Sequence, residues 1–158
     1  EGSNKQYLLL SHDDTTKVKQ GLIDLRRSIL NRYPRSIISF MTIPPVDFSK
    51  YRENLGLDRE PGESEEQLKH LQEVHELNNF IQDLNKQQQG EIIAHTCFWH
   101  TDVISCTKKR RKSGSFRKKV VMNHDNLYDG VHAISDVKHD WYFKWLTSVC
   151  KDIERNFW

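Results

Sequence analysis

The sequence lacks any hydrophobic run long enough to cross a membrane, which takes about 20 apolar residues in a helix. It also lacks, at its start, the charged-then-apolar segment typical of a signal peptide. Cysteine is scarce, and the three present, Cys97, Cys106 and Cys150, follow no framework spacing. An odd number without such spacing argues against a disulfide scaffold and favours buried thiols in a reducing compartment. We therefore expect a cytoplasmic protein with no membrane partner.

The sequence does contain enough apolar material for one compact domain. Its 158 residues are 36% hydrophobic and 10% aromatic, and they show no internal repeat. We expect a single domain over residues 1–158. Two segments interrupt its pattern, a polar excursion at 47–66 with a turn at Pro61-Gly62, and a basic loop at 107–119.

Short apolar runs alternate with helical patterns along the chain. We predict strands at residues 5–10, 35–43 and 91–99, because each is a short apolar run bounded by polar or turn residues. Helices are expected to start at Asp14–Thr16, near Ser64 and near Ser135. Nearly continuous apolar strands joined through helices favour an α/β three-layer sandwich, in which helices flank a mostly parallel central sheet.

The first and last helices have a recognisable apolar face. In the first helix, the apolar stripe is formed by Val18, Leu22, Leu25 and Ile29, and the opposite face carries Lys19, Arg26 and Arg27. In the last helix, the stripe consists of Val137, Trp141, Trp145 (or Phe143), Leu146, Val149 and Ile153. We expect the C-terminal aromatic residues to pack in the core or at the chain end, and these are Trp141, Trp145, Phe157 and Trp158.

The order of these elements and four sequence blocks resemble the SGNH (GDSL-type) hydrolase superfamily. The blocks are YLLLSHDD, ISFMTIPPV, HELNNFIQDLN and LYDGVHAISDVKHDW, which together span nearly the whole chain. The resemblance implies an SGNH-hydrolase-like fold, whose last block supplies a catalytic Asp and a His. Those positions here are Asp129 and His132, and in the family the His is the general base that activates a serine.

The sequence also departs from the family pattern. It has no Gly-Asp-Ser block for the nucleophile, and Ser11 and Asp13 stand where the family has a Gly and an oxyanion-binding Asn. A carboxylate at position 13 would repel an oxyanion. Two interpretations are open. The scaffold has lost its catalytic activity, or the chain belongs to a serine esterase or acyl hydrolase whose nucleophilic serine lies outside this sequence. We favour the loss, so we interpret Asp129 and His132 as vestigial and the protein as non-enzymatic.

Positive charge is concentrated in one run. Residues 108–119 hold eight Lys or Arg and no acid, whereas the remaining residues carry 16 basic and 22 acidic side chains, a net charge of −6. Such a run attracts phosphates, and neighbouring aromatic side chains can stack on unpaired bases. We predict RNA binding; a solvated or nuclear-import loop and a site for anionic lipid are the alternatives. The candidate RNA-binding residues are Lys108, Lys109, Arg110, Arg111, Lys112, Arg117, Lys118, Lys119, Arg26, Arg27, Arg32, Arg35, Trp99 and Phe116.

A degenerate SGNH scaffold with a basic surface is similar to the RNA-binding OSK domains of insect germ-plasm proteins. This resemblance implies binding to single-stranded elements of messenger 3′ untranslated regions. It also implies cytoplasmic ribonucleoprotein or germ granules as the location, with other germ-granule proteins as candidate partners. A third interpretation is a protein-interaction scaffold that has neither activity.

No cofactor or metal is expected. The spacing of His95, Cys97, His100 and Cys106 fits no standard zinc motif. Alternation along a strand would also place His95 and Cys97 on one face and His100 on the other.

Overall fold

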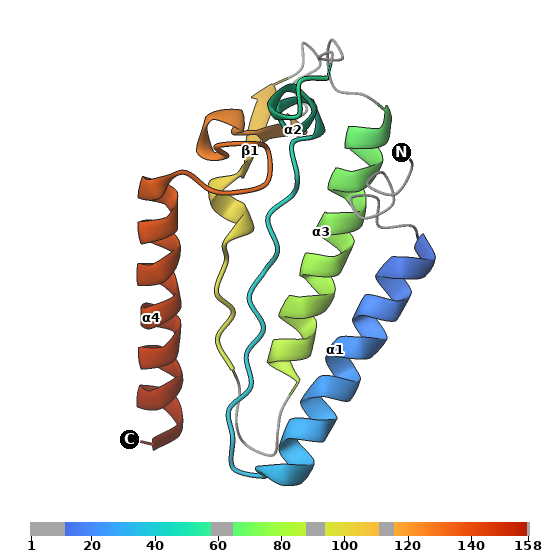
Figure 1. Cartoon of the computed structure of the whole chain (residues 1–158). Coiled ribbons are helices and arrows are strands. Elements are labelled where there is room, and N and C mark those ends of the chain that lie inside the picture. The colour runs from blue at the N-terminus through green and yellow to red at the C-terminus, as the bar shows by residue number, and fades with distance from the viewer. Residues whose placement is uncertain (1–11, 58–64, 88–93, 111–115, 158) are drawn as a thin grey trace.

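A computed structural model describes residues 12–57, 65–87, 94–110 and 116–157 (Figure 1). Helices dominate this part of the chain. The elements in chain order are α1 (His12–Arg32), α2 (Phe48–Asn54), α3 (Glu65–Lys86), a 3-10 turn η1 (His100–Asp102), β1 (Ile104–Arg110), β2 (Phe116–Met122), a second 3-10 turn η2 (His124–Asn126) and α4 (Ser135–Phe157).

The long helices lie on two sides of a pair of extended segments (Figure 1). Helices α1 and α3 pack against each other on one side, and α4 lies on the other. Between them run the segment that precedes α2 and the segment 94–99. These two segments are joined by a hydrogen bond from the Thr42 amide to the Cys97 carbonyl, 3.0 Å long. The Thr42 hydroxyl accepts a further bond from the Trp99 amide at 2.9 Å.

The expectation of an α/β sandwich with a mostly parallel central sheet is wrong. Within the described ranges, the strands are β1 and β2, which pair antiparallel from Ile104↔Met122 to Arg110↔Phe116. Residues 36–43 and 94–99 form no strand, and Arg35 lies in a turn, so the expected strand–helix–strand unit is not present in the described part. The expected strand at 5–10 and the start of the one at 91–99 lie outside the described residues.

Polar side chains of α3 take the place of a neighbouring strand for residues 40–48. Asn85 binds both backbone groups of Phe40, since its Oδ1 accepts from the amide at 2.9 Å and its Nδ2 donates to the carbonyl at 2.8 Å. Asn78 does the same for Ile43, at 2.7 and 2.8 Å. An apolar run therefore stays extended without sheet partners, because amide side chains satisfy its backbone.

Two further residues of α3 continue this contact toward α2. Gln67 accepts a hydrogen bond from the Phe48 amide at 2.9 Å and donates to the Val46 carbonyl at 2.8 Å. His70 accepts from the Val46 amide through Nε2, at 3.0 Å. We call Gln67, His70, Asn78 and Asn85 the α3 clamp. All four side chains are buried, on a helix whose buried apolar residues are Val74, Leu77, Ile81 and Leu84.

The helices expected from the sequence are present. The first helix begins at His12 and ends at Arg32, two residues before Pro34, which disfavours helix at the residue before it. Glu65 and Glu66 occupy the first turn of α3, where carboxylates favour the helix dipole. The last helix begins at Ser135, as expected.

Two segments expected to be loops contain regular structure. The polar excursion at 47–66 holds α2, whose N-cap Asp47 accepts from the Lys50 amide at 3.1 Å. Its Pro61-Gly62 turn lies outside the described residues. The basic segment at 107–119 is a hairpin rather than a loop in its described part, because β1 and β2 run through it.

We expect Asn78→Ala to lower the free energy of unfolding by about 1–3 kcal/mol, because it removes a buried amide and leaves two partly buried backbone groups of Ile43 without this partner. The adjacent Asn79 is exposed, so Asn79→Ala is the matched control and should change it by less than about 0.5 kcal/mol. Urea unfolding measures both. Equal effects of the two substitutions would contradict the clamp.

We also expect stability to fall as the pH drops from about 6.5 toward 4. Burial lowers the pKa of His70 to about 4, and its Nε2 must stay unprotonated to accept from Val46. Between these values the unfolded chain binds a proton that the folded chain does not, so acid favours unfolding by up to about 3 kcal/mol. His70→Gln should remove this part of the pH dependence, measured by urea unfolding at both ends of the range. An unchanged pH profile in the variant would contradict it.

Candidate functional site

Asp129 organises the loop that carries the suspected catalytic pair. The loop closes on itself through a bridge between Leu127 and Ala133 and a bond from the Tyr128 amide to the His132 carbonyl, 2.7 Å long. Within it, Asp129 Oδ1 accepts from the amides of Val131 at 3.0 Å and His132 at 2.7 Å. One carboxylate oxygen is therefore used to hold the backbone of the loop.

The second carboxylate oxygen orients the imidazole. Asp129 Oδ2 lies 2.7 Å from His132 Nδ1. The Asp129 side chain is 12% exposed and that of His132 is 68% exposed. Burial raises the pKa of Asp129, but hydrogen bonds from the His132 amide, its ring and the Val131 amide outweigh this and lower the pKa to about 2.

This geometry matches the half of a catalytic triad that positions a general base. With Nδ1 held by the carboxylate, Nε2 of His132 is left to act on a solvent-side partner. Among the described residues, the imidazole has Asp129 as its hydrogen-bond partner and no serine hydroxyl on Nε2. In the described part of the chain, this geometry can orient a base.

The loop also packs tightly against the start of α2. The Asp47 amide donates to the Gly130 carbonyl at 2.8 Å. Gly130 has a φ of +87°, and a Cβ built there would lie 2.4 Å from the Asp47 carbonyl oxygen and 2.6 Å from the Tyr51 amide nitrogen. Only glycine fits both this backbone conformation and this space.

The basic hairpin brings cationic positions opposite one another. Its register places Lys108 opposite Lys118 and Lys109 opposite Arg117, with Thr107 facing Lys119. Phe116 begins β2 opposite Arg110. The hairpin is attached to the core at its base, where Val103 and Met122 are buried together with Leu127. The candidate residues Arg111 and Lys112 lie outside the described residues.

The four arginines near α1 lie apart from this hairpin. Arg26 is buried, and its guanidinium donates to the carbonyls of Leu84 and Gln87, both at 2.6 Å. Gln67, which contacts Met122 at the hairpin base, is near the opposite end of α3, about 25 Å away along the helix. Arg32 and Arg35 follow at the C-terminal end of α1, the end of the molecule opposite β1 (Figure 1).

The structure thus separates the sequence candidates. Arg27 is exposed and pairs with Asp24 at 3.0 Å, and Arg32 lies over the ring of Tyr33. Arg26 was expected on the polar face of the first helix. This expectation is wrong, because its guanidinium binds the end of α3. The sequence held a signal for this, because Arg26 follows Leu22 by four residues and precedes Ile29 by three, which puts it on the apolar stripe.

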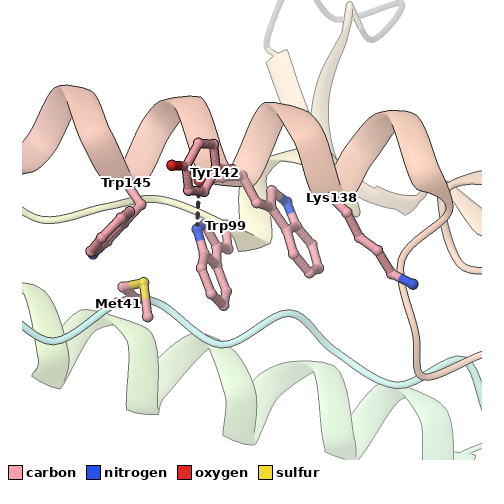
Figure 2. Close-up of a pocket in the computed structure, with 6 residues that line it drawn as sticks. Met41, Trp99, Lys138, Tyr142 and Trp145 are labelled. Atoms are coloured by element: carbon pink, nitrogen blue, oxygen red, sulfur yellow. Dashed lines mark hydrogen bonds between the residues drawn. The ribbon is translucent and has the colours of Figure 1, made fainter.

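A pocket beside α4 gathers aromatic side chains that the sequence assigned to different roles (Figure 2). The rings of Trp99 and Trp141 are stacked, with centroids 5.0 Å apart and planes 7° from parallel. The Trp99 indole N–H donates to the Trp141 carbonyl at 3.3 Å. We call this cavity of about 410 Å³ the tryptophan pocket; its lining residues are Met41, Trp99, Lys138, Trp141, Tyr142 and Trp145.

The expected burial of the last helix is only partly confirmed. Val137 is buried and Trp141 is half-buried. Trp145 is 41% exposed, so its assignment to the core is wrong, and Val149 and Ile153 are exposed as well. A second cavity of about 270 Å³ continues along this face and shares Met41 and Trp145 with the tryptophan pocket. The apolar stripe of α4 therefore borders an open groove.

Two of the remaining histidine and cysteine candidates, His95 and Cys97, have structural contacts. The His95 ring and amide both contact Asp152 Oδ1, at 2.7 and 2.6 Å, which ties the segment 94–99 to α4. Cys97 is buried, and its carbonyl binds Thr42.

In comparisons with protein-family profiles, curated proteins and solved structures, none matched this chain. The likeness to SGNH hydrolases therefore remains one of sequence blocks. None of the described helices combines the length and the apolar character that crossing a bilayer requires.

We expect Gly130→Ala to destabilise the protein by at least about 3 kcal/mol, because strain at positive φ adds to a backbone clash. Gly56 has a φ of +72° but open space around it, so Gly56→Ala should cost only about 1 kcal/mol. Urea unfolding of the two variants separates conformational strain from the contact with Asp47 and Tyr51. Similar losses in both would mean that the loop does not pack against α2.

Proposed function

We propose that this chain is a non-enzymatic RNA-binding domain whose basic hairpin contacts the RNA backbone. The observation that carries the proposal is the register of β1 and β2, which sets Lys108 opposite Lys118 and Lys109 opposite Arg117. Like charges directly opposite one another on antiparallel strands are unfavourable. A polyanion relieves this repulsion and gains free energy from the counterions that it releases.

The negative charge of the rest of the chain supports RNA binding at the hairpin alone, and not over the whole surface. Outside residues 108–119 the net charge is −6, so an RNA strand would be repelled from most of the surface and drawn to the hairpin. The exposed arginines Arg32 and Arg35 lie at the opposite end of the molecule and are not part of the surface that we propose. Arg26 is left out as well, since its guanidinium is bound to α3.

Single-stranded RNA is the partner that we propose, because aromatic side chains near the hairpin offer stacking surfaces that a duplex cannot reach. The resemblance to OSK domains adds messenger 3′ untranslated regions as the target. It also adds cytoplasmic germ granules, with their proteins, as the setting.

We expect replacement of Lys108–Lys112 by serine to weaken RNA binding and to flatten its salt dependence. Removal of five cations lowers the slope of log affinity against log salt by up to about 3.5 for a single strand. Fluorescence polarisation at two or more salt concentrations measures this. The double variant Arg32→Ser, Arg35→Ser removes charge at the opposite end and should leave the slope unchanged.

Two results would contradict the proposal. Unchanged affinity after the Lys108–Lys112 replacement would remove the hairpin from the interface. Turnover of a p-nitrophenyl ester that is lost in His132→Ala and retained in His139→Ala would show that Asp129 and His132 still work with a nucleophile.

A further inference from the structure

We propose that the tryptophan pocket binds an unpaired base of the RNA, while the basic hairpin holds the adjoining phosphates. This inference rests on the proposed function, since it assigns part of the same RNA to a second place on the surface. The pocket combines an aromatic wall, an open apolar space and one cation, which are the three features that a stacked nucleotide uses.

The pocket wall is fixed before any ligand arrives. Trp99 and Trp141 lie face to face with planes 7° from parallel, and the Trp99 indole is anchored on the Trp141 carbonyl. Trp141 also packs against the buried cluster that holds the hairpin base. A preorganised ring stack loses little conformational freedom on binding, so most of the stacking energy is available to a base.

The open side of the pocket exposes large apolar groups. Trp145 is 41% exposed, Tyr142 is 55% exposed and Met41 is 36% exposed. Figure 2 shows the side chains of Trp145 and Trp99 on either side of Met41, with Tyr142 above. A cavity of about 410 Å³ lies within the range of about 300–1,000 Å³ that small-molecule sites occupy, which is ample for a single base. Aromatic and apolar surface left open in this way marks a binding site.

The charge of the lining favours a nucleotide over an uncharged apolar ligand. Lys138 is the cationic side chain among the lining residues that the structure describes. It is exposed, and Figure 2 shows its ammonium group at one end of the pocket. That position suits a phosphate bonded to the sugar of a stacked base.

The pocket and the hairpin are also connected along the chain. Trp99 immediately precedes η1, and β1 begins at Ile104. At about 3.3 Å per residue, Lys108 lies about 13 Å along the strand from Ile104, a distance that a few nucleotides span. One short single strand can therefore place a base in the pocket and its neighbouring phosphates on the hairpin.

The test compares two RNA oligonucleotides of equal length and charge, each about 12 nucleotides long. One carries unpaired bases and the other carries abasic residues. We expect the abasic strand to bind the full chain roughly 5- to 150-fold more weakly, the range for loss of one stacked base. Trp145→Ala should weaken binding of the base-bearing strand by a similar factor and leave binding of the abasic strand unchanged.

Phe143→Ala is the matched control, because Phe143 is an exposed aromatic residue on the same helix that does not line the pocket. It should bind both strands as the unsubstituted chain does. Urea unfolding establishes that Trp145→Ala is folded, and substitution of Lys138 by Ser gives a second pocket variant that should also weaken binding of the base-bearing strand.

Each other outcome overturns the inference in a distinguishable way. If both strands bind equally and the Lys108–Lys112 replacement weakens that binding, the proposed function stands, but the pocket does not bind a base. Base-dependent binding that is unaffected by Trp145→Ala places the base elsewhere. Absence of binding to either strand overturns the proposed function as well. Concentration-dependent dimers in sedimentation that disappear in Trp145→Ala would make the pocket a contact between two copies of this chain.

Discussion

The α3 clamp is the interaction on which the rest of the structure depends. The segment that leads into α2 forms no strand, and its backbone bonds to other parts of the described chain go to Cys97 from Thr42 and to Gly130 from Asp47. Asn78 and Asn85 bind both backbone groups of the residues that they face, and Gln67 binds the Val46 carbonyl and the Phe48 amide at the start of α2. Each such bond adds only about 1 kcal/mol net, but a buried backbone group without a partner costs about 1–3 kcal/mol. The clamp therefore matters chiefly because its loss would leave those groups unpaired.

Both candidate surfaces are positioned through this segment. Its C-terminal end carries Asp47, which caps α2 and donates its amide to the Gly130 loop. Its centre carries Thr42, which holds the amide of Trp99 through its hydroxyl. The Asp129–His132 pair and the tryptophan pocket thus depend on one backbone that α3 fixes. A substitution in the α3 clamp should therefore change the geometry of both sites, although neither site contains a clamp residue.

The helices could be predicted from the sequence because their signals are local. Capping and acidic residues, helical apolar spacing and Pro34 mark α1, α3 and α4 to within a few residues. The sheet could not be predicted, because an apolar run such as 35–43 reports burial and not the identity of the partner. Asn78 and Asn85 supplied that partner from a helix. Their spacing from Val74 and Ile81 places them on the buried face of α3, but it does not show which backbone they bind. For the same reason the apolar stripe of α4 was recognised, while its exposure at Trp145 was not.

The geometry of Asp129 gives this residue a structural role that does not depend on catalysis. Its carboxylate accepts two loop amides in addition to the imidazole, so it stabilises the loop whether or not His132 ever moves a proton. The same loop docks on α2 through Gly130 and contributes Leu127 to the cluster that holds the hairpin base. A substitution at Asp129 would therefore disturb the support of the basic hairpin. An Asp-x-x-His pattern in a sequence therefore does not by itself distinguish a structural role of the Asp from a catalytic one.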